Sequence, residues 1–441
     1  MLSVLLALLP LAYLIRMCIV HHVDVPFWDQ WAMVPRLEHM AAGRLTFTDF
    51  WGQHNEHRPL VPVATMLVLA KLSNWNIGWE IGANVAIGAA IFAVFSAYIF
   101  TAWRDRGGAP ILLLPVISLL VFSPVQWENW VWGWQIQVLM CALASITGAY
   151  LIASGTRRRG GFAGALACGV WATYSFASGL VYWAAQPPGI WMAGGGRRVA
   201  RLLVWIAVAA VTAATYFYDF HRPSQPSMLS NFASLAAIRQ FAMYLLTYLG
   251  APIEWTSQRG AAAAGGAIAV VYAALVIRLW HLRGEKAFLF PFLVGLQTFA
   301  TATVSALGRA WMGVDQALTS RYTTFTLPLW CAVACLLVLW QSTSRPGALA
   351  HARTLVVASV IAATLWASFI SGRYAVVTVA GRNETLMLAR RGLITGWSDT
   401  MLLQLFPNLD TIREQRATLM RLHLSVFRPT SYATYPMPGA K

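Results

Sequence analysis

Two carboxylates lie close together in a polar segment that follows the apolar N-terminal stretch. Asp24 and Asp29 belong to the run HHVDVPFWDQW, in which Asp29 lies between Trp28 and Trp31. Indole rings favour the membrane interface, and they lower the local dielectric, which raises the proton affinity that a general base requires. The alternative is that both carboxylates cap the short helices that follow. The sequence leaves both roles open.

A second polar run directly precedes an apolar stretch and contains His54, Glu56, His57 and Arg58. The histidines and the glutamate have side chains that bind metals, but their spacing is not HExxH and no single helix face would align them. Imidazole and guanidinium groups at the start of a helix suit a phosphate group better. We therefore expect phosphate binding here and no metal site, with a solvated loop as the alternative.

A third cluster, QWENWVWGWQIQ at positions 126–137, contains four tryptophans in eight residues. The rings could form an aromatic belt at the membrane surface. Polar residues continue into the next apolar stretch, however, where they are costly and usually line a cavity. Tryptophan rings can cover the C–H faces of a sugar while amides and carboxylates bind its hydroxyls. The candidate sugar contacts are Trp127, Glu128, Asn129 and Gln135.

A fourth cluster places two arginines near the start of a late apolar stretch. Arg309 precedes it by several residues, and Arg321-Tyr322 abuts it directly. An anionic lipid head or a pyrophosphate would suit both guanidinium groups. The alternative is an arginine that snorkels from a helix end. We expect both arginines to converge with Arg58 on one phosphate, with Tyr322 beside them.

The composition indicates which scaffold must position these clusters. Hydrophobic residues make up 58% of the 441 residues and charged residues 11%, whereas a soluble domain has about 45–50% and about 25%. Apolar runs near the roughly 20 residues needed to cross a bilayer recur along the chain. We predict an all-α bundle with eleven membrane spans, at 1–20, 81–103, 110–124, 135–154, 161–176, 178–194, 202–220, 261–281, 287–307, 325–341 and 354–372.

The remaining segments fall into three kinds. Two shorter apolar stretches, 60–72 and 241–255, each carry a proline and are expected to be interfacial or re-entrant. Residues 1–372 form the predicted transmembrane domain, with a long first outside loop at 21–80 that contains short helices. Residues 373–441 form a small C-terminal segment outside the membrane.

The net charge of +16 is distributed unevenly. If the N-terminus is cytoplasmic, the inside loops hold thirteen basic residues against two acids, and the outside loops hold nine basic residues and ten acids. This is the positive-inside pattern of membrane proteins, so the charge does not indicate nucleic-acid binding. All four polar clusters then lie on the non-cytoplasmic side.

Together these features resemble the GT-C superfamily of membrane glycosyltransferases. Those enzymes have many spans and a long first outside loop, with an Asp-containing pair shortly after the first span. The run PFWDQW at 26–31 matches that position, and Arg321-Tyr322 before a span resembles a later element of the same enzymes. The resemblance covers about residues 1–341. Gln30 departs from it, because many members have a second acid there.

The resemblance implies sugar transfer from a polyprenyl-phosphate-linked donor to an envelope glycan or lipid acceptor. The expected location is the periplasmic face of a bacterial inner membrane. Asp29 would be the general base, with Asp24 in reserve. No cofactor is required by the motifs, although a divalent cation is compatible with them. The residues expected to hold the phosphate are His54, His57, Arg58, Arg309 and Arg321.

Two other functions fit the same clusters. One is a flippase or other transporter of lipid-linked sugars, which would more often show internal repeat symmetry. It would also spread polar residues through the depth of the bilayer, whereas here they gather on one side. The other is a non-catalytic membrane subunit of an envelope assembly, which would leave the carboxylates and the His/Arg run without a role.

Overall fold

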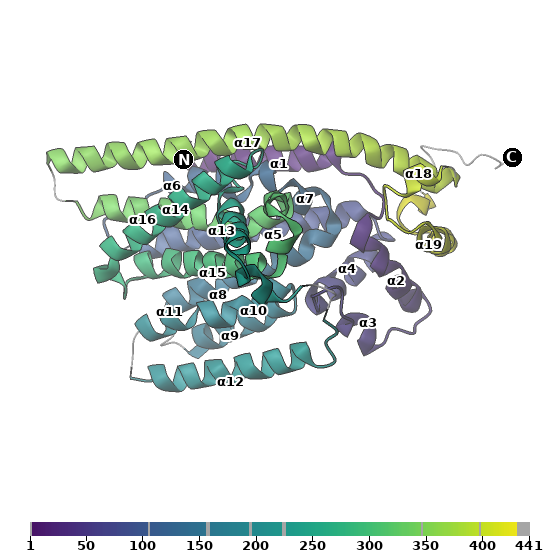
Figure 1. Cartoon of the computed structure of the whole chain (residues 1–441), viewed down its shortest axis with the longest axis horizontal. Coiled ribbons are helices and arrows are strands. Elements are labelled where there is room, and N and C mark those ends of the chain that lie inside the picture. Colours follow the sequence, from purple (N-terminus) through teal and green to yellow (C-terminus); the bar gives the residue numbers. More distant parts are fainter. Residues whose placement is uncertain are drawn as a thin grey trace.

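The fold of the chain is built from helices alone in the computed structural model, which describes residues 2–104, 106–155, 159–193, 196–222, 226–344, 347–396 and 398–429. Across these ranges the helices are joined by short turns, and no strand is present (Figure 1). The predicted all-α, polytopic fold class is confirmed.

Eight helices of the described part of the chain are long and apolar enough to cross a bilayer. They are α1 (Leu2–His21), α5 (Ile77–Ala102), α8 (Ile136–Ala153), α12 (Arg198–Phe217), α14 (Gln258–Arg278), α15 (Lys286–Arg309), α16 (Thr323–Ser342) and α17 (Ala348–Thr395). Burial separates the centre of the bundle from its surface. In α16 83% of the apolar window is buried inside the protein, against 17% in α12. The apolar surface of α12 must therefore face lipid.

Three of the eleven predicted spans are shorter than a bilayer requires. Span 110–124 contains only α6 (Leu113–Val121), and span 161–176 corresponds to α9 (Arg159–Thr173). Span 178–194 is divided into α10 (Leu180–Ala185) and α11 (Pro187–Met192). The division falls at Pro187, which has no N–H to donate to the preceding turn of helix.

The last predicted span does not end where the sequence suggested. Helix α17 has 48 residues and continues without a break across position 372. At a rise of 1.5 Å per residue it is about 72 Å long, whereas the hydrocarbon core is about 30 Å thick. Its second half therefore reaches well beyond the membrane, to α18 (Asp399–Leu402) and α19 (Leu409–Arg421), as Figure 1 shows.

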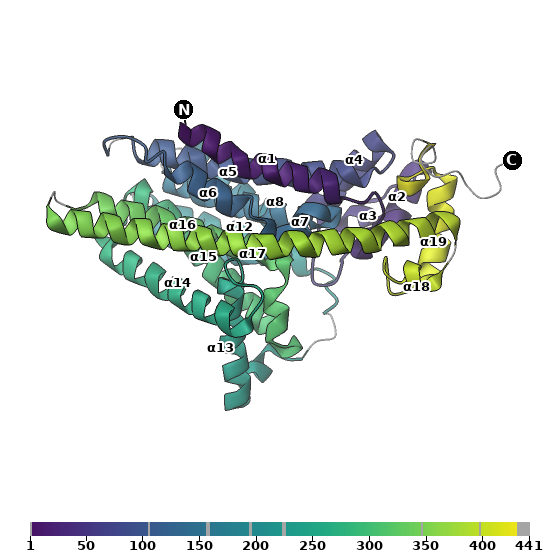
Figure 2. The same ribbon diagram turned by 90° about the horizontal axis from the view of Figure 1, so that it is seen from above.

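The first loop meets this C-terminal region at one end of the bundle, which we call the polar end. The loop contains a 3-10 helix, η1 (Trp28–Met33), followed by α2 (Val34–Ala41) and α3 (Phe47–Trp51). Helix α19 packs against α2, and both views place these elements together (Figures 1 and 2).

Contacts between basic loops mark the opposite end. Arg106, after α5, forms an ion pair with Glu285, which precedes α15. Lys286 donates to the Thr101 hydroxyl at 2.6 Å and lies over the Tyr150 ring. The ends of α5 and α8 thus meet the start of α15, and all of these residues belong to predicted inside loops or to the helix ends beside them.

The two apolar stretches that were excluded from the spans are both helical. The first is α4 (Leu60–Ser73), and the second lies mostly within α13 (Leu235–Gly250). Helix α13 packs against α14 and stands at a steep angle to the rest of the bundle in Figure 2. Their re-entrant or interfacial placement stays a prediction.

Candidate functional site

A cavity of about 480 Å³ opens at the polar end and collects side chains from all four polar clusters. The sequence-predicted residues that line it come from the first loop, from the Trp-rich segment and from the two turns that flank α15 and α16. They are Asp29, His54, Glu56, His57, Glu128, Gln135, Arg309, Arg321 and Tyr322. Nine of the thirteen predicted site residues therefore share one cavity, although the chain separates Asp29 from Tyr322 by almost three hundred residues.

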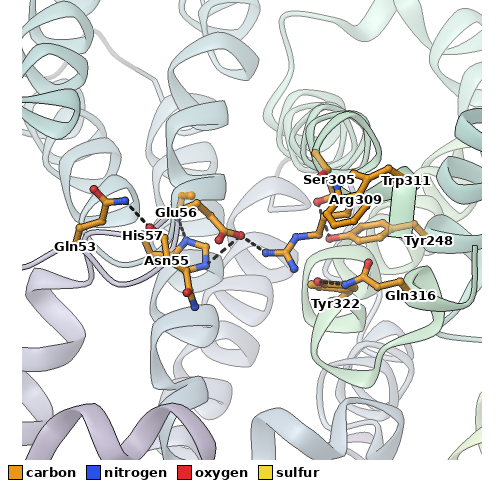
Figure 3. A network of polar contacts seen from close by, with 12 residues as sticks. Gln53, Asn55, Glu56, His57, Tyr248, Ser305, Arg309, Trp311, Gln316 and Tyr322 are labelled. Carbon is orange, nitrogen blue, oxygen red and sulfur yellow. Dashed lines mark hydrogen bonds and ion pairs between the residues drawn. The ribbon is translucent and has the colours of Figure 1, made fainter. Parts of the chain in front are cut away.

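A tight turn holds Glu56 in this cavity. The backbone groups of His54 and His57 exchange two hydrogen bonds, of 2.8 and 2.9 Å. The turn requires Asn55 to adopt a left-handed φ of 50°, a conformation that asparagine tolerates better than most residues. The Glu56 side chain consequently points toward Arg309, with which it forms an ion pair (Figure 3).

The surroundings of the turn also shift the pKa values of two of its side chains, Glu56 and His57. Burial lowers the pKa of His57 to about 4, and the nearby Arg309 and His54 act in the same direction, although Glu56 opposes them. The hydrogen bonding agrees, because His57 Nδ1 accepts the Ala177 N–H at 3.2 Å and so carries no proton. Burial acts to raise the pKa of Glu56, but His57 and Arg309 outweigh it and the net shift is downward. At neutral pH the turn presents a carboxylate beside a neutral imidazole.

The second arginine is held in a similar way on the other side of the cavity. Arg321 Nη1 lies 3.2 Å from Glu128 Oε1, and the Arg321 backbone N–H donates to the other carboxylate oxygen at 3.0 Å. Both guanidinium groups lie against one aromatic ring, because the Cζ atoms of Arg309 and Arg321 are 5.7 and 5.5 Å from the centre of the Tyr322 ring. Tyr322 is fixed in turn by a hydrogen bond from Gln316 of 2.6 Å (Figure 3). The structure thus brings Arg309 and Arg321 together around one ring, whereas their binding of a phosphate stays a prediction.

Asp29 is the cavity carboxylate that no arginine engages among the described residues. Its carboxylate lies 3.3 Å from His54 Nε2 and its side chain is 32% exposed. Glu56 and Glu128, by contrast, are each committed to an ion pair. Of the three cavity carboxylates, Asp29 is therefore the one whose lone pairs are most available to accept a proton.

Asp24 lies outside the cavity. One of its carboxylate oxygens accepts the Ile77 N–H at the start of α5, at 3.0 Å, and the other pairs with Arg428. A carboxylate at a helix N-terminus satisfies a free N–H group and the helix dipole. The structure thus gives Asp24 the capping role, although the capped helix is α5 and not one of the short helices that follow directly.

Arg58 is likewise separated from the other two arginines. Its guanidinium is 3% exposed and lies over the Trp51 ring. It donates to the backbone carbonyls of Tyr216 at 2.6 Å and of Trp51 at 3.1 Å, and also to those of Tyr218 and Asp219. The bonds to Tyr216, Tyr218 and Asp219 tie the first loop to the end of α12. The predicted meeting of three arginines does not occur.

Asn129 and Trp127 lie in the wall beside the cavity. The Asn129 amide is fully buried and donates to the Arg321 carbonyl at 2.9 Å, so it holds the backbone of Arg321. Trp127 faces a second cavity instead. A sugar bound in the first cavity would meet Trp132 and Trp134, which line it.

Glu80 is a buried acid that the sequence analysis did not single out. It is 1% exposed and accepts hydrogen bonds from Gln30 at 2.6 Å and from Trp75 at 2.9 Å. Gly133 packs so closely on it that a Cβ there would lie 1.9 Å from Glu80 Oε2. Gln30 is thus paired with an acid from another segment. The available signal was an ionisable residue at the start of an apolar span, which is rare.

The described residues contain no group of three or more His, Cys, Asp or Glu side chains arranged to hold a metal ion. Two of the three cavity acids, Glu56 and Glu128, are each paired with an arginine.

Comparison with known proteins gives one match. No protein-family model matches the chain, and no curated protein matches its sequence significantly. Among solved structures, the chain is similar to ArnT from Cupriavidus metallidurans, in a crystal structure bound to undecaprenyl phosphate. The two chains are 15% identical with a TM-score of 0.43, and the match covers 98% of this chain and 78% of that one.

Proposed function

We propose that this protein is a membrane glycosyltransferase that moves a sugar from a polyprenyl-phosphate-linked donor to an acceptor on the non-cytoplasmic face. One observation carries the proposal: the carboxylate of Asp29 and the two arginines on Tyr322 line the same cavity. Its volume of about 480 Å³ lies within the roughly 300–1,000 Å³ of small-molecule sites.

In this mechanism Arg309 and Arg321 bind the donor phosphate. A guanidinium has five N–H donors, so each arginine can keep its bond to Glu56 or Glu128 and still donate to a phosphate oxygen. The ion pairs also fix the side chains before the ligand arrives, which reduces the ordering cost of binding. As the sugar–phosphate bond breaks, negative charge grows on the leaving phosphate, and the two arginines stabilise it.

Asp29 acts on the acceptor. The acceptor hydroxyl attacks the anomeric carbon, the bond from that carbon to the phosphate oxygen breaks, and Asp29 takes the hydroxyl proton. The tryptophans of the cavity wall cover the sugar, and Gln135 and Gln137 supply amides for its hydroxyls. No step needs a proton on the phosphate, because the polyprenyl phosphate, a phosphate monoester, leaves as a stable anion.

The test is a transfer assay with the full chain in nanodiscs. A panel of undecaprenyl-phosphate-linked sugars is supplied together with envelope extract as the source of acceptor, and release of undecaprenyl phosphate is measured. The proposal predicts release with at least one sugar, and loss of that release in Asp29→Asn. Movement of the intact donor between leaflets, with no release, would indicate a transporter instead.

A further inference from the structure

A second cavity lies against the first and shares a wall with it. It encloses about 270 Å³, and Phe27, Trp28, Glu128 and Trp132 line both cavities. Two contacts hold the shared wall together: Trp132 Nε1 donates to the Phe27 carbonyl at 3.1 Å, and the two rings meet edge to face. The remaining lining residues come from α7 (Trp127–Val131), from α17 and from the C-terminal segment. They are Trp127, Arg382, Thr385, Leu386 and Gln404.

Two charged side chains line this cavity, Arg382 and Glu128, and the Glu128 carboxylate is paired with Arg321. The Arg382 guanidinium Cζ lies 4.6 Å from the centre of the Phe27 ring and 5.8 Å from that of Trp127. Its hydrogen bond to the Val131 carbonyl is long, at 3.5 Å. Within the described ranges no carboxylate lies close enough to Arg382 to form an ion pair. Arg309 and Arg321, in the first cavity, each have a glutamate partner.

The neighbours of Arg382 leave particular groups for a ligand. Aromatic rings lie against the guanidinium, so its N–H groups are best reached along the edge of its plane, a geometry that suits two oxygens of a carboxylate or phosphate. Trp127 Nε1 is buried and has no hydrogen-bond partner in the described part of the chain, which is uncommon for a buried donor. Thr385 and Gln404 add further donors and acceptors along the rim.

We infer that this second cavity binds an anionic group, a carboxylate or a phosphate, carried by the acceptor of the transfer reaction. The assignment of this anionic group to an acceptor rests on the proposed function, whereas anion binding at Arg382 does not. An acceptor anchored here would extend past Trp28, which lines both cavities, and bring its hydroxyl to Asp29 in the first. The two substrates would then enter separate cavities and meet at the shared wall.

The test uses cysteine protection on the full chain in nanodiscs. Thr385 is exposed on the rim of the second cavity and Asn55 on that of the first, so Thr385→Cys and Asn55→Cys report on the two sites. Maleimide labelling of each is measured above the background of the native cysteines. The probes are glucuronate, inorganic phosphate, glucose and undecaprenyl phosphate. Glucuronate or phosphate should slow labelling of Thr385→Cys, and glucose should not; the two anions distinguish a carboxylate site from a phosphate site.

Arg382 variants decide whether the anion is bound as inferred. Loss of a charge-assisted hydrogen bond is worth roughly 1.5–3 kcal/mol, so Arg382→Gln should raise the half-protecting anion concentration by about tenfold or more. Arg382→Lys keeps the charge without the planar edge, and should give an intermediate value even if Arg382→Gln folds poorly. Equal protection by glucose, or anion protection unchanged in both variants, would overturn the inference.

Undecaprenyl phosphate separates this inference from the proposed function. It should protect Asn55→Cys and leave Thr385→Cys accessible. Failure to protect Asn55→Cys would count against the proposed donor site, while anion protection of Thr385→Cys would still establish the second cavity as an anion site. Protection of Thr385→Cys by undecaprenyl phosphate and by neither free anion would contradict the assignment of the second cavity to the acceptor.

Discussion

Arg428 forms an ion pair with Asp24 across 404 positions of sequence. The contact is one of several by which the C-terminal region holds the first loop. The Trp28 N–H donates to the Leu405 carbonyl at 2.7 Å, and the Ser425 N–H donates to the Asn74 carbonyl at 3.1 Å. Trp28 adopts a left-handed φ of 47°, which is unfavourable for a bulky residue. The C-terminal region therefore helps to maintain the conformation of the residue that precedes Asp29.

Removing the Arg428 side chain should destabilise the protein far more than removing a neighbouring exposed arginine. The Asp24–Arg428 pair is largely buried, with side-chain exposures of 14% and 15%, whereas the Glu38–Arg421 pair has exposures of 36% and 60%. Arg428→Ala leaves a buried carboxylate unpaired and should cost up to about 3 kcal/mol. Arg421→Ala should cost less than about 1 kcal/mol. Thermal unfolding in nanodiscs measures both, and equal effects would show that the Asp24 contact is not special.

The two arginines on Tyr322 should each contribute to donor affinity. Arg309→Ala or Arg321→Ala removes a charge-assisted bond to phosphate worth roughly 1.5–3 kcal/mol, which corresponds to about 10- to 150-fold weaker binding. Affinity for undecaprenyl phosphate provides the measurement. Arg58→Ala is the matched control, because Arg58 bonds to backbone carbonyls outside the cavity; it should lower stability and leave the affinity of the folded protein unchanged. Unaltered affinity for undecaprenyl phosphate in both cavity variants would show that Arg309 and Arg321 do not bind the donor phosphate.

Stability should decline in mild acid, in part through His57. Burial lowers its pKa from 6.5 to about 4 in the folded protein, so between these pH values the unfolded chain binds more protons. Stability that is present above pH 6.5 is therefore lost as the pH falls toward 4. The lowered pKa of Glu56 acts in the same direction, because its protonation weakens the ion pair with Arg309.

His57→Asn tests this assignment. The asparagine amide oxygen can still accept the Ala177 N–H, but the side chain no longer titrates. The melting temperature of the variant should fall less steeply between pH 6.5 and 4 than that of the unchanged protein. Parallel curves for the two proteins would assign the acid sensitivity to other groups.

The membrane orientation predicts which side of the bilayer reaches each end of the bundle. With a cytoplasmic N-terminus, a cysteine at Arg283, near the Arg106–Glu285 pair, should react with an impermeant maleimide only from the cytoplasmic side. Asn55→Cys, on the rim of the first cavity, should react only from outside. Arg158, in the most basic predicted inside loop, lies outside the described residues but should follow Arg283. Outside labelling of Arg283→Cys would reverse the orientation.

The sequence predicted the fold class and most of the cavity lining for identifiable reasons. Apolar runs and few charges specify membrane helices whatever their packing. Polar residues such as Glu128 and Arg321 are costly at the membrane edge unless they line a cavity, so their types and positions indicated a site before any contact was known.

The features that the sequence did not predict depend on long-range packing. Nothing local distinguishes Arg58, which binds backbone carbonyls from α12, from Arg309, which faces the cavity. Asp24 could be assigned to a cap, but its partners Ile77 and Arg428 come from distant segments. The role of Arg382 required knowledge that α17 continues past position 372 and reaches the tryptophan cluster, because the polar composition of 373–441 indicated only that this segment leaves the membrane.

Turnover by Asp29→Asn, compared with turnover by Asp24→Asn, shows whether Asp29 is the catalytic base. Asparagine keeps the shape of the side chain and removes its basicity. With release of undecaprenyl phosphate measured per folded protein, Asp29→Asn should lower turnover by at least about 100-fold, the low end for general-base catalysis, with donor affinity unchanged. Asp24→Asn should lower stability and leave turnover largely intact. Near-normal turnover by Asp29→Asn would show that Asp29 is not the base, although it is the one cavity carboxylate in the described part of the chain that no arginine engages.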